Sequence, residues 1–238
     1  MIESADPAER AMILSEDGWG RIIALIAAAD GDISGAEDAL STALERAVTA
    51  WRAQGPPSNS EGWLYRVALN ARRDVWRSAA ARTLTALDEE TIDRIDACTD
   101  PAHHDPDALP DRRLELLAAC AHPDIDPPAR PLLMLSAVMG MTAKQIAAAM
   151  ALPAATVSAR LTRAKKRVAG LGVAFGSPDR LDLESRLPDV FEAIYGAFAI
   201  EWAQAAAQPR EGMIGEALYL SRLVAELCPG DGESHGLA

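Results

Sequence analysis

The chain has 238 residues, enough for one large domain or two small ones, and a formal net charge of −12. Aromatic residues make up only 5% of it, alanine is abundant, and alternating runs of β-branched residues are almost absent, so we predict an all-α fold. No signal peptide and no apolar run of membrane-spanning length are recognisable, so we expect a cytoplasmic protein.

The negative charge is unevenly distributed along the chain. Residues 81–109 contain 8 acidic and 2 basic side chains, whereas residues 110–172 contain 4 acidic and 9 basic ones. Contacts to phosphates dominate DNA affinity, so an acidic protein with one small basic patch should bind DNA weakly alone. The sequence therefore favours a DNA-binding protein that a larger partner delivers to its site.

Apolar residues at helical spacing predict three amphipathic helices near the N-terminus, over about residues 16–29, 34–51 and 60–77. We expect Ser34 and Glu37 to form a capping box at the second helix. The apolar stripe of the third helix continues to Val75. The segment between the last two helices, residues 52–61, is rich in Gly, Pro and Ser and is predicted to be a loop.

The segment from residue 111 to residue 172 is predicted to contain a helix-turn-helix. Helices around 113–120 and 128–139, the latter ended by Gly140, precede it. Thr142 is expected to cap its first helix, with Ile146 and Met150 on one face, and Ala151-Leu152-Pro153 to end it. The second helix is basic and carries an apolar stripe at Val157, Leu161, Ala164, Val168 and Leu171. In a helix-turn-helix such a helix enters the DNA major groove, although an ordinary helical hairpin with a solvated basic face gives the same pattern.

Two further amphipathic helices are predicted after residue 180. Their expected apolar faces consist of Leu187, Val190, Phe191, Ile194, Tyr195, Phe198 and Trp202, and of Ile214, Leu218, Leu223 and Leu227. Because one hairpin cannot bury faces this broad, we expect it to dock onto the preceding domains and to regulate them in cis.

Metal, cofactor and enzyme chemistry find little support. The histidines and cysteines that come closest to a cluster lack the CxxC and HxxxH spacings of metal sites; they are Cys98, His103, His104, Cys120 and His122. Glycine-rich phosphate loops and nucleophile elbows are absent. We expect no cofactor, no metal and no enzymatic activity.

The order of three segments, AEDALSTALERAVTAW, WLYRVALNARRDVWR and MTAKQIAAAMALPAATVSARLTRAKKRV, resembles bacterial extracytoplasmic-function (ECF) sigma factors of the sigma-70 family. The resemblance spans about residues 15–172. It implies sigma domain two over 1–82, an acidic linker over 83–110 and sigma domain four over 111–172. Residues 173–238 and the phrase AACAHPDID resemble the subgroup with a C-terminal helical extension, whose members are usually longer.

The resemblance also implies partners and site residues. Core RNA polymerase would be bound at the clamp helices of its largest subunit and at the flap of its second-largest subunit; the clamp-binding residues would be Glu37, Asp38, Glu45, Arg46 and Trp51. The minus-ten promoter element would be opened and bound by Arg66, Asn70, Arg72, Arg73 and Arg77. The minus-thirty-five element would be contacted by Thr156, Ser158, Arg160, Arg163, Lys165 and Lys166.

Two other functions fit parts of this pattern. A sigma mimic or adaptor that binds an anti-sigma factor without directing transcription would explain the acidic balance, but it would have no need of the arginines in WLYRVALNARRDVWR. A one-component repressor with a ligand-binding C-terminal domain would lack the domain-two block. The sequence leaves open whether the two sigma domains pack together in the free protein.

Overall fold

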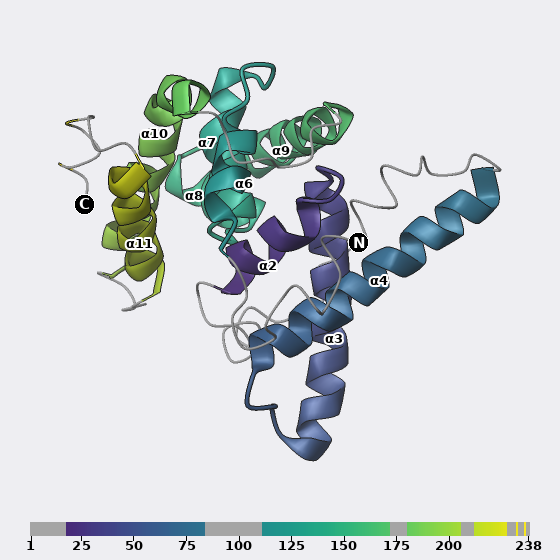
Figure 1. The fold of residues 1–238 in the computed structure, drawn as a ribbon. Helices are drawn as coiled ribbons and strands as arrows, with labels where there is room; N and C mark the ends of the chain where they lie inside the picture. Colours follow the sequence, from purple (N-terminus) through teal and green to yellow (C-terminus); the bar gives the residue numbers. More distant parts are fainter. Residues whose placement is uncertain are drawn as a thin grey trace.

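A computed structural model describes residues 18–83, 111–171, 180–205 and 212–227, together with Gly232 and Gly236. Every regular element in these ranges is a helix, which confirms the all-α prediction. Figure 1 shows their arrangement, with bounds as follows: α2 (Gly18–Ala27), α3 (Ile33–Gln54), α4 (Ser60–Thr83), α6 (Arg113–Cys120), the 3-10 helix η1 (Pro127–Ala129), α7 (Arg130–Ala137), α8 (Ala143–Ala149), α9 (Ala154–Gly170), α10 (Arg180–Ala205) and α11 (Gly212–Leu227). Within these ranges no helix is long and apolar enough to cross a membrane. The predicted acidic linker, apart from Thr83, lies outside them.

The first three helices, α2, α3 and α4, form one packed unit, which we call domain two. Ile22, Leu40, Leu44 and Leu64 are fully buried where α2 and α4 pack against α3. These residues recur at helical spacing, so the helices expected here are confirmed. The loop between α3 and α4 is shorter than predicted and covers residues 55–59.

The capping box expected at Ser34 and Glu37 is wrong. The N-cap of α3 is Asp32, whose Oδ1 accepts a hydrogen bond of 3.0 Å from the backbone N–H of Gly35. A carboxylate placed just before the first turn satisfies that N–H and favours the helix dipole. Glu37 is therefore released from the cap and turns toward a distant part of the chain.

Three apolar residues expected on buried faces lie at the surface instead. Val75 is 53% exposed, Met150 39% and Tyr195 48%. Met150 is the C-cap of α8, where the helical periodicity that placed it beside Ile146 ends.

The helix-turn-helix is confirmed in α8 and α9. Thr142 caps α8, and its side chain and that of Gln145 form a reciprocal capping box. The chain turns through Ala151, which has a positive φ of 51°, and α9 begins after Pro153. The stripe predicted for α9 is buried at Val157, Leu161, Ala164 and Val168. With α6 and α7 these helices form a second unit, which we call domain four.

The last two helices pack against domain four as the docking hypothesis expected. Leu187, Val190, Phe191 and Ile194 of α10 are buried, and α10 contacts α6 and α7. Two polar contacts support this packing. The Nη1 atom of Arg130 lies 2.8 Å from Asp189 Oδ2, and Arg186 donates to the carbonyl oxygen of Ala118 at 2.8 Å. Regulation by this extension stays a prediction.

Candidate nucleic-acid interface

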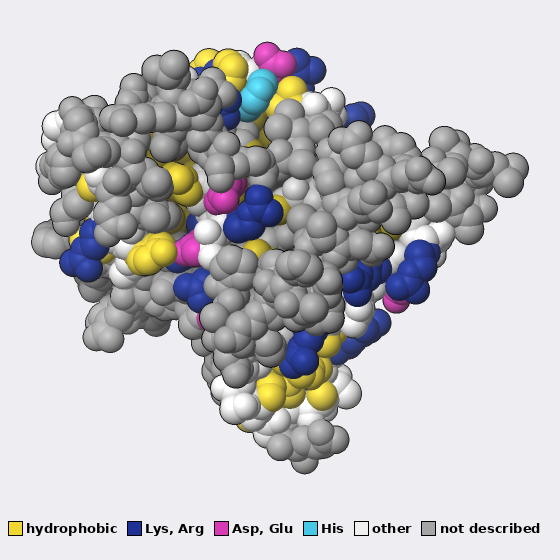
Figure 2. Space-filling model, in the orientation of Figure 1, with side chains coloured by type: hydrophobic (Ala, Val, Ile, Leu, Met, Phe, Trp, Pro, Cys, Tyr) yellow, Lys and Arg dark blue, Asp and Glu magenta, His cyan; other side chains and the backbone are white. Residues whose placement is uncertain are grey.

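The DNA-binding residues predicted in α4 separate into two groups. Arg66, Asn70, Arg73 and Arg77 follow one another at spacings of three and four residues, which places them on one helix face. Arg66, Asn70 and Arg77 are exposed and Arg73 is half-buried. Figure 2 shows Lys and Arg side chains gathered along α4. This face is available to a polyanion.

Arg72 lies on another side of α4 and is 7% exposed. Its Nη2 atom lies 2.5 Å from Asp30 Oδ2 and 2.6 Å from Asp32 Oδ2. A Cβ atom at Gly35 would overlap this guanidinium, so the glycine leaves room for it. Asp30 and Asp32 therefore bind the guanidinium of Arg72, the side chain that the resemblance assigns to DNA.

Trp76 of α4 belongs to the same cluster. Its Nε1 donates a hydrogen bond of 3.0 Å to Asp30 Oδ2, and the guanidinium carbon of Arg72 lies 5.2 Å from the ring centroid. The sequence signal for this pairing is the presence of Asp30 and Asp32 just before α3 together with the basic Arg72 on α4.

The predicted polymerase-binding residues of α3 occupy different environments. Asp38, Glu45 and Arg46 are exposed, so their charged groups face solvent. Trp51 is half-buried, and its ring lies 5.3 Å from that of Trp63 at an angle of 60°. Glu37 is paired with a lysine of α9, as described below.

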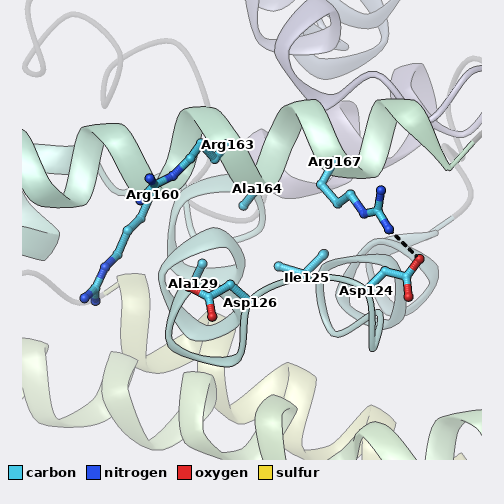
Figure 3. A pocket seen from close by; sticks show the side chains of 8 residues that line it. All are labelled: Asp124, Ile125, Asp126, Ala129, Arg160, Arg163, Ala164 and Arg167. Carbon is cyan, nitrogen blue, oxygen red and sulfur yellow. Dashed lines mark hydrogen bonds and ion pairs between the residues drawn. The ribbon is translucent and has the colours of Figure 1, made fainter.

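One side of α9 faces the segment that precedes α7. Arg160, Arg163 and Arg167 line a hollow of about 200 Å³ together with Asp124, Ile125, Asp126, Ala129 and Ala164 (Figure 3). Arg167 Nη2 lies 2.9 Å from Asp124 Oδ2, and this pair is half exposed. Arg163 and Lys166 are exposed and Arg160 is half-buried. Arg163 and Lys166 are thus predicted DNA-contacting cations of α9 that lie open to solvent.

The other side of α9 faces α3 of domain two. Ser158, Thr162 and Lys165 line a second hollow, of about 350 Å³, between the two domains. Lys165 Nζ lies 2.7 Å and 2.6 Å from the two carboxylate oxygens of Glu37. Thr156, the remaining predicted contact, is half-buried. The structure thus places the predicted DNA contacts of α9 on two different sides of the helix.

A polar network joins the start of domain four to the extension. Arg113 is fully buried, its Nη2 lies 2.6 Å from Asp111 Oδ2, and its guanidinium carbon lies 4.4 Å from the Tyr219 ring centroid. Burial alone would raise the pKa of Asp111, but hydrogen bonds and attraction from Arg113 outweigh it and lower that pKa below its ordinary value. Burial and a hydrogen bond to Asp111 raise the pKa of Tyr219.

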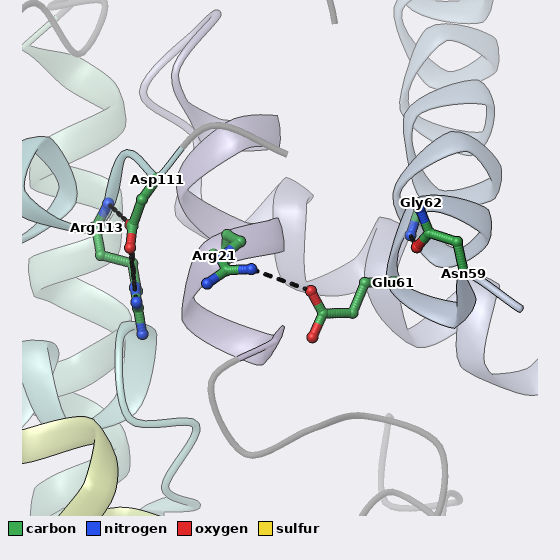
Figure 4. A network of polar contacts seen from close by, with 6 residues as sticks. All are labelled: Arg21, Asn59, Glu61, Gly62, Asp111 and Arg113. Atoms are coloured by element: carbon green, nitrogen blue, oxygen red, sulfur yellow. Dashed lines mark hydrogen bonds and ion pairs between the residues drawn. The ribbon is translucent and has the colours of Figure 1, made fainter. Parts of the chain in front are cut away.

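In Figure 4, Asp111 and Arg113 lie on one side of Arg21 of α2, and Glu61 of α4 lies on its other side. Arg21 Nη1 lies 3.3 Å from Glu61 Oε2. Sequence reasoning missed the role of Arg113, because a buried arginine has no periodic signature.

The described residues of the considered metal cluster, Cys120 and His122, do not belong to a group suited to a metal ion. Burial raises the pKa of the Cys120 thiol, which keeps it protonated. Partial burial, followed by the nearby Arg186 cation, lowers the pKa of His122. Groups of three His, Cys, Asp or Glu suited to a metal ion are absent from the part of the chain that the structure describes. Cys98, His103 and His104 lie outside that part.

Comparison with known families identifies the helix-turn-helix. Residues 121–168, which include α7, α8 and nearly all of α9, match the family "Sigma-70, region 4". This helix-turn-helix segment belongs to the sigma-70 family. This sigma-70 domain is a DNA-binding helix-turn-helix, so α9 is its recognition helix.

The extension and the whole chain have further relatives. Residues 186–238 match a family of unknown function, DUF6596. An uncharacterised protein of Rhizobium meliloti (strain 1021) is 34% identical over 216 residues, covering 85% of this chain and 48% of that protein. The chain therefore spans about half the length of this relative. No solved structure matches the chain at a significant level.

Proposed function

We propose that the chain is an ECF sigma factor, which binds core RNA polymerase and directs promoter-specific transcription initiation. The observation that carries this proposal is the sigma-70 region 4 match over a capped helix-turn-helix whose recognition helix presents Arg160, Arg163 and Lys166. A sigma factor acts through recruitment and DNA binding, so the function requires no cofactor and no catalytic residue of its own. It places the chain in the cytoplasm, beside polymerase and DNA.

The geometry supports the binding of two different promoter elements by two separate basic surfaces. The face of α4 that carries Arg66, Asn70, Arg73 and Arg77 is proposed to hold the minus-ten element, because three of these side chains are exposed. The open side of α9 is proposed to contact the minus-thirty-five element. The exposed residues Asp38, Glu45 and Arg46 of α3 are proposed to bind the polymerase clamp helices.

The proposal is tested by run-off transcription with purified core polymerase on pooled genomic promoter fragments. Specific transcripts are expected with the protein and not without it. Changing Arg66 and Arg77 to Ala, or Arg160 and Arg163 to Ala, should reduce them at least tenfold, roughly the effect of losing two phosphate or base contacts. Arg222→Ala, which removes an exposed arginine of α11, is the matched control and should leave the transcripts unchanged. Arg72 is unsuitable for this test because it is buried.

The alternative function, a sigma mimic or adaptor that binds an anti-sigma factor, predicts a different outcome. A mimic yields no transcripts and no co-elution with core polymerase, and its behaviour is unaffected by the arginine substitutions. Absence of both transcripts and co-elution would therefore reject the sigma factor proposal.

A further inference from the structure

The described parts of domains two and four meet in a shared apolar core. One cluster of buried apolar residues includes Ile22 and Leu40 of domain two as well as Leu117 and Val138 of domain four. Helix α2 contacts α6, and α3 contacts α9. Figure 1 likewise shows α2 and α3 against the domain-four helices. Small-molecule sites occur preferentially where domains meet, and the hollow of about 350 Å³ lies at this junction.

Four serines of the described chain line this hollow, namely Ser34 and Ser41 of α3, Ser136 of α7 and Ser158 of α9. Ser41 and Ser136 are only 8% and 7% exposed. Within the part of the chain that the structure describes, neither of these two hydroxyls forms a hydrogen bond. Most buried polar side chains have a hydrogen-bond partner. Two buried hydroxyls that line the same hollow therefore indicate a polar molecule bound between them.

The charges around the hollow favour a cation over an anion. In the described ranges its charged lining side chains are Glu37, Asp38 and Lys165. Lys165 Nζ lies 2.7 Å and 2.6 Å from the two oxygens of Glu37, so these two charges balance each other. Asp38 is exposed and forms no ion pair with the described residues. The remaining negative charge repels phosphate groups and attracts a positively charged ligand.

The size and the apolar lining of the hollow limit the ligand further. A volume of about 350 Å³ is at the lower end of the range of small-molecule sites, roughly 300–1,000 Å³. This volume suits a molecule with a single ring. Trp19, Met141 and Leu161 supply apolar lining. An indole packs well against the C–H groups of such a ring and also attracts a cation.

We propose that this hollow binds a small hydroxylated amine of monosaccharide size, an amino sugar being the simplest example. The hydroxyl groups of the ligand form hydrogen bonds with Ser41 and Ser136, and its ammonium group pairs with the carboxylate of Asp38. Because the lining comes from α3, α7 and α9, the ligand contacts both domains. The inference goes beyond the proposed function and is independent of it, since binding requires neither polymerase nor DNA.

Binding is measured by isothermal titration calorimetry of the full chain with glucosamine, at a slightly acidic pH where its amine is charged. We expect one saturable site with a Kd of about 1 mM, which is typical of a ligand this small. Absence of saturable binding at concentrations far above this value would overturn the proposal and leave water as the occupant of the hollow.

The role of the charge is tested with N-acetylglucosamine, which keeps the ring but has no ammonium group. It should bind at least about fivefold more weakly than glucosamine. In Asp38→Asn this difference should disappear, because the carboxylate that distinguishes the two sugars is gone. A difference that persists in Asp38→Asn would overturn the pairing of the ammonium group with Asp38.

The role of the buried hydroxyls is tested with Ser41→Ala and Ser136→Ala, which remove one oxygen atom each and add no volume. Each substitution should weaken glucosamine binding about fivefold, the effect of losing one hydrogen bond. Ser221→Ala in α11 is the matched control, because this serine is fully buried but lies outside the lining of the hollow, and its Kd should equal that of wild type. An unchanged Kd in both hollow variants would overturn the proposed location.

A measurement on the wild-type chain keeps the inference testable if these variants fail to fold. Nuclear magnetic resonance of isotopically labelled protein should show the largest glucosamine-induced shifts at the amides of Ser41, Ser136 and Ser158. Shifts confined to α10 and α11 would overturn the proposed site.

The outcomes are separate from those of the proposed function. Failure of glucosamine to bind rejects the hollow as an amine site and leaves the sigma factor function standing, because run-off transcription contains no such ligand. Failure of transcription rejects the sigma factor function and does not affect the titration.

Discussion

At the scale of single residues, Arg72 shows how the environment of a side chain redefines its role. The resemblance groups it with Arg66, Asn70, Arg73 and Arg77 as contacts to the minus-ten element. In the structure its guanidinium is 7% exposed and is bound by Asp30 and Asp32 at the start of α3. These contacts tie α4 to the N-terminus of α3. Arg72 therefore positions the helices that carry the exposed basic face.

We predict that Arg72→Met lowers the free energy of unfolding by about 3 kcal/mol, because Asp30 and Asp32 lose their shared cation in a largely buried site. The measurement is urea unfolding followed by circular dichroism. Arg77→Met is the control, since the Arg77 side chain is 75% exposed, and it should change stability by no more than about 0.5 kcal/mol. Equal effects of the two substitutions would contradict the structural role of Arg72.

At the scale of helices, Asp111, Arg113 and Tyr219 connect the first turn of domain four to α11. The lowered pKa of Asp111 means that its charged form is favoured in the folded chain, despite a burial cost that acts in the opposite direction. The folded-state pKa lies below the ordinary value of 3.8. The stabilisation is therefore fully present above that value and is lost as the pH falls through the folded-state pKa.

We predict that Asp111→Asn destabilises the protein at neutral pH and that its difference from wild type stays constant down to about pH 4 and narrows only as the pH falls below 3.8. Denaturant unfolding at several pH values measures this difference. Asp38→Asn, at an exposed position of α3, should show little difference at any pH. A gap between wild type and Asp111→Asn that stays constant with pH would contradict the contribution of the charged Asp111.

At the scale of the molecule, the DUF6596 segment is packed onto domain four. The buried face of α10 includes Ile194, which is fully buried, and α10 lies against α7. Domain four in turn shares a core with domain two. A substitution that loosens the packing of the extension should therefore also lower the local stability of domain four.

We predict that Ile194→Ala lowers stability by about 3 kcal/mol and accelerates hydrogen exchange of the α7 amides, because a cavity forms in the apolar core that α10 shares with α7. Tyr195→Ala is the neighbouring control. Its side chain is 48% exposed, so exchange in α7 should stay at the wild-type rate. Faster exchange confined to α10 and α11 would show that the extension unfolds independently of domain four.

The amino-acid pattern was sufficient where the physical cause is local. Thr142 caps α8 and Val157 begins a buried stripe in α9 because hydrogen bonds and apolar spacing within one helix dictate both. The all-α class and the helix-turn-helix follow from such patterns. Local patterns also misled: Ser34 has a good capping sequence, but Asp32 precedes it and captures the helix N-terminus.

Contacts between distant segments were decided by the packing of helices in three dimensions. Glu37 and Lys165 are 128 positions apart in the sequence, on two different helices. The spacing of charged residues within one helix does not indicate which distant residue each of them contacts. The same is true of Arg72, which the resemblance grouped with Arg66 and Arg77 as a DNA contact. The helices and their basic faces are therefore properties of the sequence. Which of those faces is covered, and by which other helix, depends on the fit of backbones such as Gly20 against Val138, where steric overlap determines how closely the domains approach.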